Sequence, residues 1–202
     1  MPNPTGIDKS KVLLGTADQT TTGAVLVAPV GTALPTLTDL TKASVTIDNA
    51  FAPAGYISED GCSLGLDISV EQIREWNRGI VKSALESFDG TVELTFIQTD
   101  EQTMKIIVGD DHTTVTNATS TDGKKVMAKF GTHLPDPQSW IIKLKDGDAR
   151  AMIVIPVGQV TSFDTVEMTA TDVIGWHVTI TAMDDGSGDS IYFMTNDGVV
   201  SA

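Results

Sequence analysis

A nucleophilic serine is the first chemistry that this sequence offers. Residues 61–65 spell G-x-S-x-G, the pattern in which a sharp turn between a strand and a helix exposes a catalytic serine. Here the preceding segment, 55–61, is turn-like, and the following segment, 66–70, alternates apolar and polar residues as a strand does. Because no helix follows, we interpret Ser63 as a small polar residue in a turn that leads into a strand, and we expect no catalytic residues.

Metal and cofactor chemistry is not indicated either. The three histidines, His112, His133 and His177, lie far apart in the sequence, and Cys62 is the single cysteine, so no metal-ligand spacing is present. The acid-rich segment 184–189 lacks the ligand spacing of a calcium-binding loop, and a hairpin turn explains it. The chain contains no phosphate-binding loop and no dinucleotide fingerprint, so no cofactor is expected.

The composition describes an acidic globular chain. Its 202 residues carry a formal net charge of −14, which repels nucleic-acid phosphates and anionic membranes. The longest apolar stretch, 151–158, is interrupted by Pro156 and is too short to span a bilayer. The first 15 residues lack the apolar segment of a signal peptide. We therefore expect folding in a cytoplasm and no membrane partner.

Asp-Gly pairs recur along the chain and predict hairpin turns, because this dipeptide supplies the positive φ angles of tight turns. They occur at 60–61, 89–90, 122–123, 146–147, 185–186 and 197–198. The segment 139–157 is interpreted as strand, turn and strand, and 176–196 as the same plan with a longer loop. The three tryptophans fall within or at the ends of these strands, where core or rim packing explains them better than a carbohydrate-binding platform does.

One short helix is predicted at 99–109, where Thr99 or Asp100 can cap the first turn and Gly109 ends it. The segment 80–89 fits either helical or strand spacing, and its position between two strands favours a strand. We expect a mainly β fold, an antiparallel sandwich or barrel with one flanking helix.

Four segments, in order, resemble the major tail proteins of long, non-contractile-tailed bacteriophages, most of all those of phages that infect actinobacteria. The segments are GAVLVAPVGTALPT (23–36), IDNAFAPAGYISEDG (47–61), LDISVEQIREWNRGIVKS (66–83) and VELTFIQTDEQTMKIIVG (92–109). The resemblance covers about residues 23–110, and the C-terminal third follows the pattern less clearly.

The resemblance implies a structural subunit of a phage tail tube. Such proteins form hexameric rings that stack around a lumen through which the genome leaves the virion. The implied partners are other copies of the chain, the tape-measure protein, the tail terminator and the distal tail proteins, with DNA passing unbound. Residues 1–54 are then an N-terminal arm and inter-ring loop, and 55–202 the β-sandwich core. The implied location is the virion tail, assembled in the host cytoplasm.

The alternation of side chains along a strand predicts which residues would face such a lumen. The apolar residues expected in the core are Leu66, Ile68, Val70, Val92, Leu94 and Phe96. Asp67, Glu71 and Glu93 then lie on the opposite face, where a solvated outer surface is the alternative to a lumen wall.

Three other functions fit parts of the sequence. A tail terminator or decoration protein would share the β composition but would form no long tubes. A serine hydrolase would use Ser63 and react with a fluorophosphonate probe. A carbohydrate-binding sandwich would be secreted and monomeric, and the absence of a signal peptide counts against it.

Overall fold

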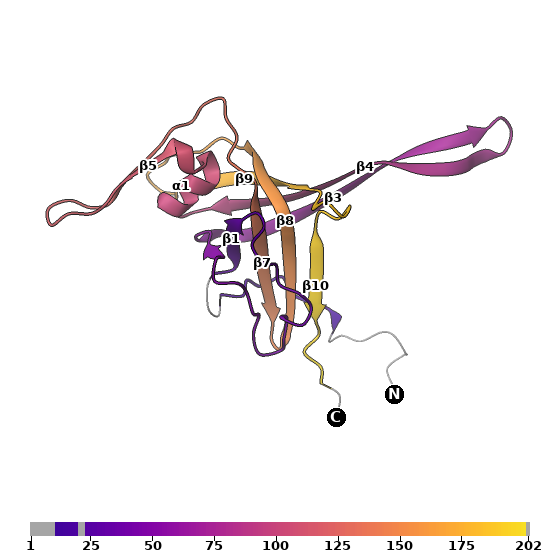
Figure 1. Ribbon diagram of the computed structural model, residues 1–202, viewed down its shortest axis with the longest axis horizontal. Coiled ribbons are helices and arrows are strands. Elements are labelled where there is room, and N and C mark those ends of the chain that lie inside the picture. Colours follow the sequence, from indigo (N-terminus) through magenta and orange to yellow (C-terminus); the bar gives the residue numbers. More distant parts are fainter. Residues whose placement is uncertain (1–10, 20–22, 201–202) are drawn as a thin grey trace.

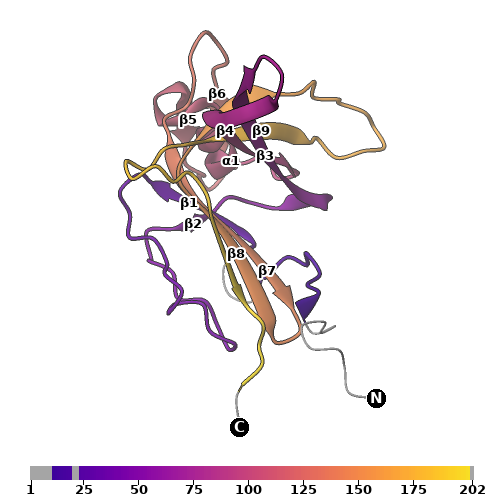
Figure 2. The same cartoon turned by 90° about the vertical axis from the view of Figure 1, so that its right-hand side faces the viewer.

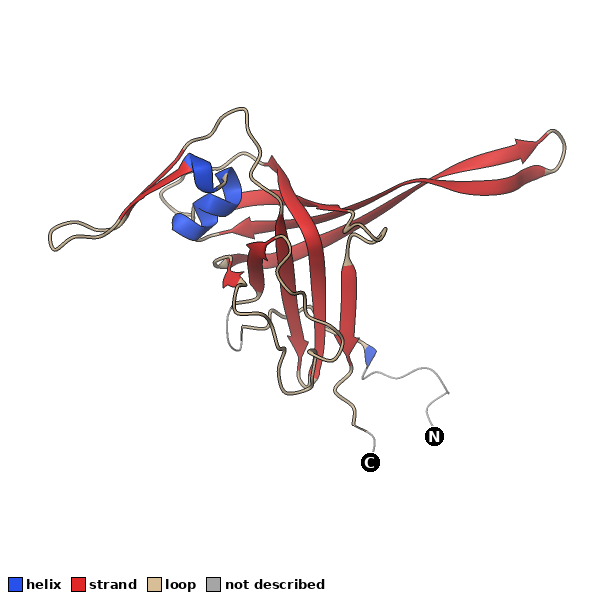
Figure 3. Ribbon diagram, viewed as in Figure 1, coloured by secondary structure: helices blue, strands red, loops and turns tan. Residues whose placement is uncertain are grey.

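The fold is mainly β, as expected, with one α-helix among the described residues (Figure 3). The computed structural model describes residues 11–19 and 23–200. The strands are β1 (Val25–Pro29), β2 (Ala52–Pro53), β3 (Ile57–Glu75), β4 (Gly79–Phe96), β5 (Thr113–Thr116), β6 (Lys125–Ala128), β7 (Gln138–Asp146), β8 (Ala149–Phe163), β9 (Trp176–Met183) and β10 (Tyr192–Asn196). The helix α1 spans Glu101–Val108, and a 3-10 turn, η2, spans Asp110–His112. No described helix is long and apolar enough to cross a membrane.

One antiparallel sheet of eight strands organises the molecule. Its order is β2-β1-β7-β8-β9-β4-β3, and β10 pairs with β8. In Figure 1, β7, β8 and β10 run steeply down the view, while β9, β4 and β3 cross them above. The long strand β8 belongs to both parts, because its first half pairs with β7 and β10 and its second half with β9. The separate β5–β6 hairpin projects to the opposite side from the tip of the β3–β4 hairpin.

Both faces of the steep part of the sheet are buried. Alternate residues of β1, β7 and β8 point into two cores, so Val25 and Ile153 enter one core while Leu26 and Met152 enter the other. This explains why the sequence of these strands is continuously apolar instead of alternating. Trp140 is fully buried there, and its indole N–H donates to the carbonyl of Gly158 at 3.1 Å.

The first core lies between the crossing strands and α1. The helix contributes four buried apolar residues, Met104, Ile106, Ile107 and Val108, and β4 and β9 contribute Val92, Leu94, Phe96, Val178 and Ile180. Asp100 caps the helix by accepting a hydrogen bond from the Thr103 amide at 2.9 Å. Gly109 follows it at a φ of 90°, which favours glycine, so both predicted ends of this helix are confirmed.

The long segment between β1 and β2 covers the second core. Leu40 and Phe51 are buried there against Leu26, Ile141 and Val154. The segment is therefore packed at these two points, although much of its surface is exposed. Of the N-terminal arm and loop expected at 1–54, residues 1–10 and 20–22 lie outside the described part of the chain.

Asp-Gly pairs mark turns or loops at four of the six predicted positions. The pair at 146–147 joins β7 to β8, and those at 122–123, 185–186 and 197–198 lie in loops. The predicted turns at 60–61 and 89–90 are wrong, because both pairs lie inside long strands. Gly61 supplies its positive φ of 74° where the β3–β4 register shifts, which is a bulge instead of a turn.

Two further expectations need correction. The strands β9 and β10 do not form the predicted hairpin, because both pair with the same long strand, β8. Leu66, Ile68 and Val70 were expected in the core, but all three are exposed. Alternation does place them on the core side of β3, yet the body ends near Gly90, where Ile191 packs, and nothing in the described chain covers the strand beyond it.

Candidate functional site

The sheet face opposite the first core is polar, and we call it the polar sheet face. Because β3, β4 and β9 pair in register, alternate residues of the three strands share this face. Its members are Ser63, Asp67, Ser69, Ser87, Asp89, Thr91, Glu93, Thr95, His177, Thr179 and Thr181. The hydroxyl of Thr161 on β8 extends it, at 2.7 Å from the hydroxyl of Thr181. These members are carboxylates, hydroxyls and the imidazole of His177, with no Lys or Arg among them.

The electrostatics of this face are set by its acids. Glu93 is exposed and lies between Ser63 of β3 and Thr179 of β9. Asp67 lies directly opposite Asp89, and like charges in that position destabilise a sheet. The fold therefore keeps an unfavourable pair of charges on the surface instead of neutralising it.

Glu71 occupies a different part of the same side of β3. It is exposed and pairs with Ala84, beyond a register shift that follows Ser69. The alternation along β3 keeps it on the side of Asp67, but on the hairpin that projects from the body. Of the three acids predicted for this face, Glu93 thus lies on the body of the sheet, Asp67 lies just beyond the edge of the body opposite Asp89, and Glu71 lies farther out on the hairpin.

Ser63 has no catalytic surroundings in the described structure. It is an exposed residue within a continuous strand, opposite Glu93, and no helix follows it. His177 instead contacts Thr95, with 3.0 Å between Nδ1 and Oγ1. Asp164 lies 3.6 Å from the other ring nitrogen and is largely exposed, so this series of groups lacks the sheltered geometry of a triad.

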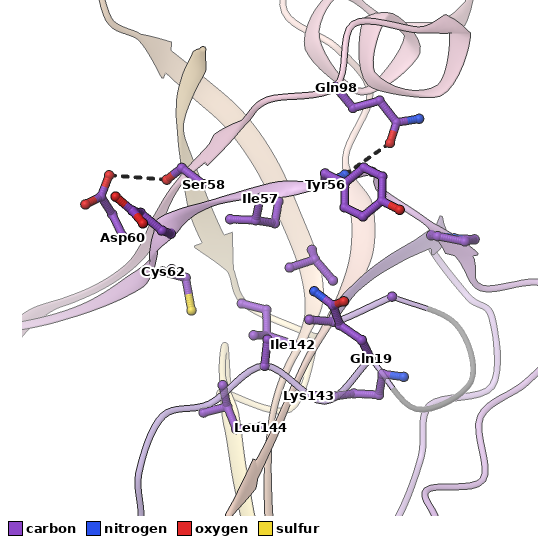
Figure 4. Close-up of a pocket in the computed structure, with 18 of the residues that line it drawn as sticks. Gln19, Tyr56, Ile57, Ser58, Asp60, Cys62, Gln98, Ile142, Lys143 and Leu144 are labelled. Atoms are coloured by element: carbon purple, nitrogen blue, oxygen red, sulfur yellow. Dashed lines mark hydrogen bonds between the residues drawn. The ribbon is translucent and has the colours of Figure 1, made fainter. Parts of the chain in front are cut away.

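A cavity of about 960 Å³ lies beside the start of β3, between the segments 15–19 and 23–25 and the middle of β7 (Figure 4). Its lining includes Ile57, Cys62 and Ile142. Gln98, also in the lining, is uncharged, and its side-chain carbonyl accepts a hydrogen bond from the Tyr56 amide at 3.2 Å. Burial raises the pKa of the Cys62 thiol, which keeps it protonated and weakly nucleophilic. The only thiol of the sequence is therefore a poor nucleophile at this cavity.

Metal ligands do not gather in the described residues, where no group of three His, Cys, Asp or Glu side chains is placed to hold an ion. His112 and His133, distant in the sequence, stack with ring centroids 3.4 Å apart. Stacked rings direct their nitrogens past each other, which is not a coordinating arrangement.

The second unusual surface is the outer part of the β3–β4 hairpin, residues 66–89, which we call the projecting hairpin. Figure 1 shows it extending far from the body, and in Figure 2 it points toward the viewer. One of its faces continues the core side of the sheet and carries exposed apolar residues, namely Leu66, Ile68, Val70, Leu85 and Phe88. Trp76, expected in the core or its rim, is 94% exposed at the tip.

The sequence predicted the orientation of the side chains on this surface but not their exposure. The alternation that predicted a strand at 66–70 also predicted the face of each residue correctly. Periodicity cannot tell whether a neighbouring layer covers that face. Asp89 was missed because the Asp-Gly pair at 89–90 was assigned to a turn.

Comparison with known proteins decides the family. The family model described as phage tail tube protein matches residues 8–202. The chain belongs to that family. It is thus a structural component of a phage tail, and a tube built of such subunits requires self-association and contact with other tail proteins.

Two other comparisons complete this finding. A search of curated proteins gives no match. Among solved structures, the chain is similar to the anti-feeding prophage cap, a tube-terminating cap determined by cryo-EM. That likeness has 12% sequence identity and a TM-score of 0.43, and it covers 89% of this chain and 95% of the other.

Proposed function

We propose that this chain is the tail tube subunit of a long, non-contractile phage tail, that it assembles into stacked hexameric rings, and that it has no enzymatic activity. The observation that carries the proposal is the polar sheet face, whose inner part lies opposite the first core and whose members include acids but no Lys or Arg. The resemblance of residues 23–110 to tail proteins of actinobacterial phages supports this type of tail. The proposed partners are further copies, the tape-measure protein, the tail terminator and the distal tail proteins.

The polar sheet face fits the wall of a channel that conducts DNA. Asp67, Glu71 and Glu93 are proposed to face the lumen, so each would recur around every ring as a circle of like charge. Negative charge on a wall with a low-dielectric interior repels phosphates and gives passing DNA no cationic site to hold it. The unpaired outer edge of β3 is available to a neighbouring strand, and closing a ring through such edges leaves none exposed.

Assembly is tested first by negative-stain microscopy of the purified chain. We expect rings and tubes of uniform width. A chain that remains monomeric at every concentration, with and without a tape-measure fragment, would contradict the proposal. A tube terminator or decoration protein, the other virion role considered, would bind to tube ends or capsids without extending into tubes.

The lumen is tested with virions that carry Glu71→Lys and Glu93→Lys. Both residues are exposed, so the change in folding free energy is expected to stay within about 0.5 kcal/mol. Genome ejection should slow, and the slowing should grow at low salt because screening weakens. Asp136→Lys, an exposed acid outside the polar sheet face, is the matched control. Ejection at the control rate in low salt would remove these residues from the lumen.

A further inference from the structure

The projecting hairpin carries an apolar face that its own chain does not cover. Gly90 marks the edge of the body, since a side chain there would meet Ile191. From Leu66 to Glu75, at about 3.3 Å per residue, the strand extends about 30 Å beyond that point. A domain of this length has a radius of gyration of about 16 Å. The hairpin is therefore long enough to lie across most of a neighbouring subunit.

The tip of this hairpin is cationic, although the chain as a whole is strongly acidic. Arg74 and Arg78 flank the exposed Trp76 along the chain, and Lys82 pairs with Ile73 on the facing strand. Arg78 lies 4.0 Å from Glu75, and Arg74 donates to the neutral Gln72 at 3.1 Å. Within the described residues, neither Arg74 nor Lys82 has a carboxylate within 4.0 Å. Cations and a large aromatic ring thus occupy the same exposed end of the hairpin.

A surface with the complementary composition lies in the connection from β8 to β9, residues 163–175, which we call the acidic loop. It exposes the apolar side chains of Phe163, Met168, Val173 and Ile174. It also carries Asp164, Glu167 and Asp172, all exposed. No Lys or Arg follows Arg150 in the sequence, and the basic group from this part of the chain that approaches the loop is the ring of His177, 3.6 Å from Asp164.

The two surfaces lie at opposite ends of the same strand. Gly79 begins β4 at the hairpin tip, and Phe96 ends it opposite Trp176, next to the acidic loop. A contact between different surfaces at opposite ends of a subunit is directional, and repeating it generates a ring when the rotation closes.

We propose that the projecting hairpin of one subunit docks on a second copy of this chain, with its cationic Trp76 tip against the acidic loop at 163–175. This inference rests on the proposed self-assembly and specifies its interface. The apolar stripe of Leu66, Ile68, Val70, Leu85 and Phe88 is then buried between subunits. The opposite side of the hairpin, which carries Glu71 and also Lys82, remains free.

Charge complementarity selects a second copy over nucleic acid. A DNA-binding tip would require a broad cationic surface, but Glu71, Glu75 and Glu86 flank this one and would repel phosphates. A folded partner with exposed apolar side chains and localised acids matches both the stripe and the tip, and the acidic loop provides both.

Disulfide trapping between two variants tests the contact. In a Cys62→Ser background, which removes the single native thiol, one variant carries Trp76→Cys and the other Met168→Cys. Both positions are highly exposed, so folding should be retained. In assembled mixtures, oxidation should give dimers of the two variants at about tenfold the yield of the control mixture, because docking raises the effective concentration of the thiols. The control pairs Trp76→Cys with Val30→Cys, at an exposed site elsewhere.

Charge exchange provides the second test. Arg74→Glu with Arg78→Glu should abolish tubes, and adding Glu167→Lys with Asp172→Lys should restore them. Tubes that form normally with the reversed tip, or no trapping above the control, would overturn the docking while leaving the proposed function intact. Tubes that form normally while duplex-DNA binding is lost would assign the tip to nucleic acid and also overturn it. Failure of the unmodified chain to assemble would refute both proposals.

Discussion

A buried ion pair fastens two N-terminal segments to the sheet, and its removal gives the sharpest test of the fold. The guanidinium of Arg150, on β8, pairs with the carboxylate of Asp18, and the two side chains are only 3% and 4% exposed. The same guanidinium donates to the carbonyl of Lys42 at 3.2 Å and to that of Ala43 at 2.9 Å. One side chain thus holds residue 18 and the loop at 42–43 together.

Asp18→Asn removes the negative charge from this cluster without changing its size. Arg150 and the buried Lys143 would then lie near a neutral amide, and burial already lowers the pKa of Lys143. Removing one partner of a buried ion pair lowers the free energy of unfolding by about 3–5 kcal/mol, because an uncompensated charge remains in a low-dielectric site. With a urea m-value of about 2 kcal/mol/M, the unfolding midpoint should fall by about 1.5–2.5 M.

Urea unfolding, followed by tryptophan fluorescence at a concentration where sedimentation shows a monomer, measures this loss. Lys42→Ala is the matched control. Lys42 lies in the loop that Arg150 contacts, and its exposed side chain pairs with Asp148, between β7 and β8, at 2.7 Å. That pair should contribute about 0–1 kcal/mol. If Asp18→Asn shifts the midpoint no further than the control does, the cluster does not hold these segments and the reasoning is refuted.

Three further predictions concern the core, one carboxylate and one exposed segment. Gly158→Ala should cost about 1–3 kcal/mol in urea unfolding, because the added carbon would meet Trp140 Cδ1 at 2.8 Å; no loss would mean that the core has room there. Hydrogen bonds from Tyr192 and then Ser187 hold the pKa of Asp185 well below its usual range. The stability that these hydrogen bonds give the folded protein is therefore fully present above the ordinary carboxyl pKa, and it is lost as the pH falls through the lowered pKa of Asp185. Tyr192→Phe should therefore lower the melting temperature at neutral pH but not in strong acid, and an NMR titration of Asp185 should show its pKa rising; an unchanged titration would contradict the contact. Thermolysin should cut the exposed chain between residues 30 and 39 in monomers and spare it in tubes, and equal protection in both would argue against an inter-ring role.

Local signals in the sequence determined those elements whose cause is local. The helix at 101–108 could be predicted because its cap, its apolar face and its terminal glycine are all close in sequence. The β7–β8 hairpin followed from Asp146-Gly147 between two apolar runs. Val92, Leu94 and Phe96 were correctly expected in the core because alternation fixes the face of a strand. The absence of helical sequence after Ser63 also gave the correct strand there.

Tertiary structure alone decided which faces are covered and which pairs of strands meet. Leu66 and Leu94 occupy equivalent faces of one hairpin, yet Leu94 is buried in the first core while Leu66 lies past the body. The Asp-Gly pair at 89–90 became part of a strand because β9 and β3 both pair with β4 across it. Likewise β10 pairs with β8 instead of β9 because β8 is long enough to accept both. The alternation of side chains fixes which face of its own strand a residue occupies. Whether another layer of the protein covers that face depends on contacts between residues far apart in the chain, and those contacts leave no periodic pattern in the sequence.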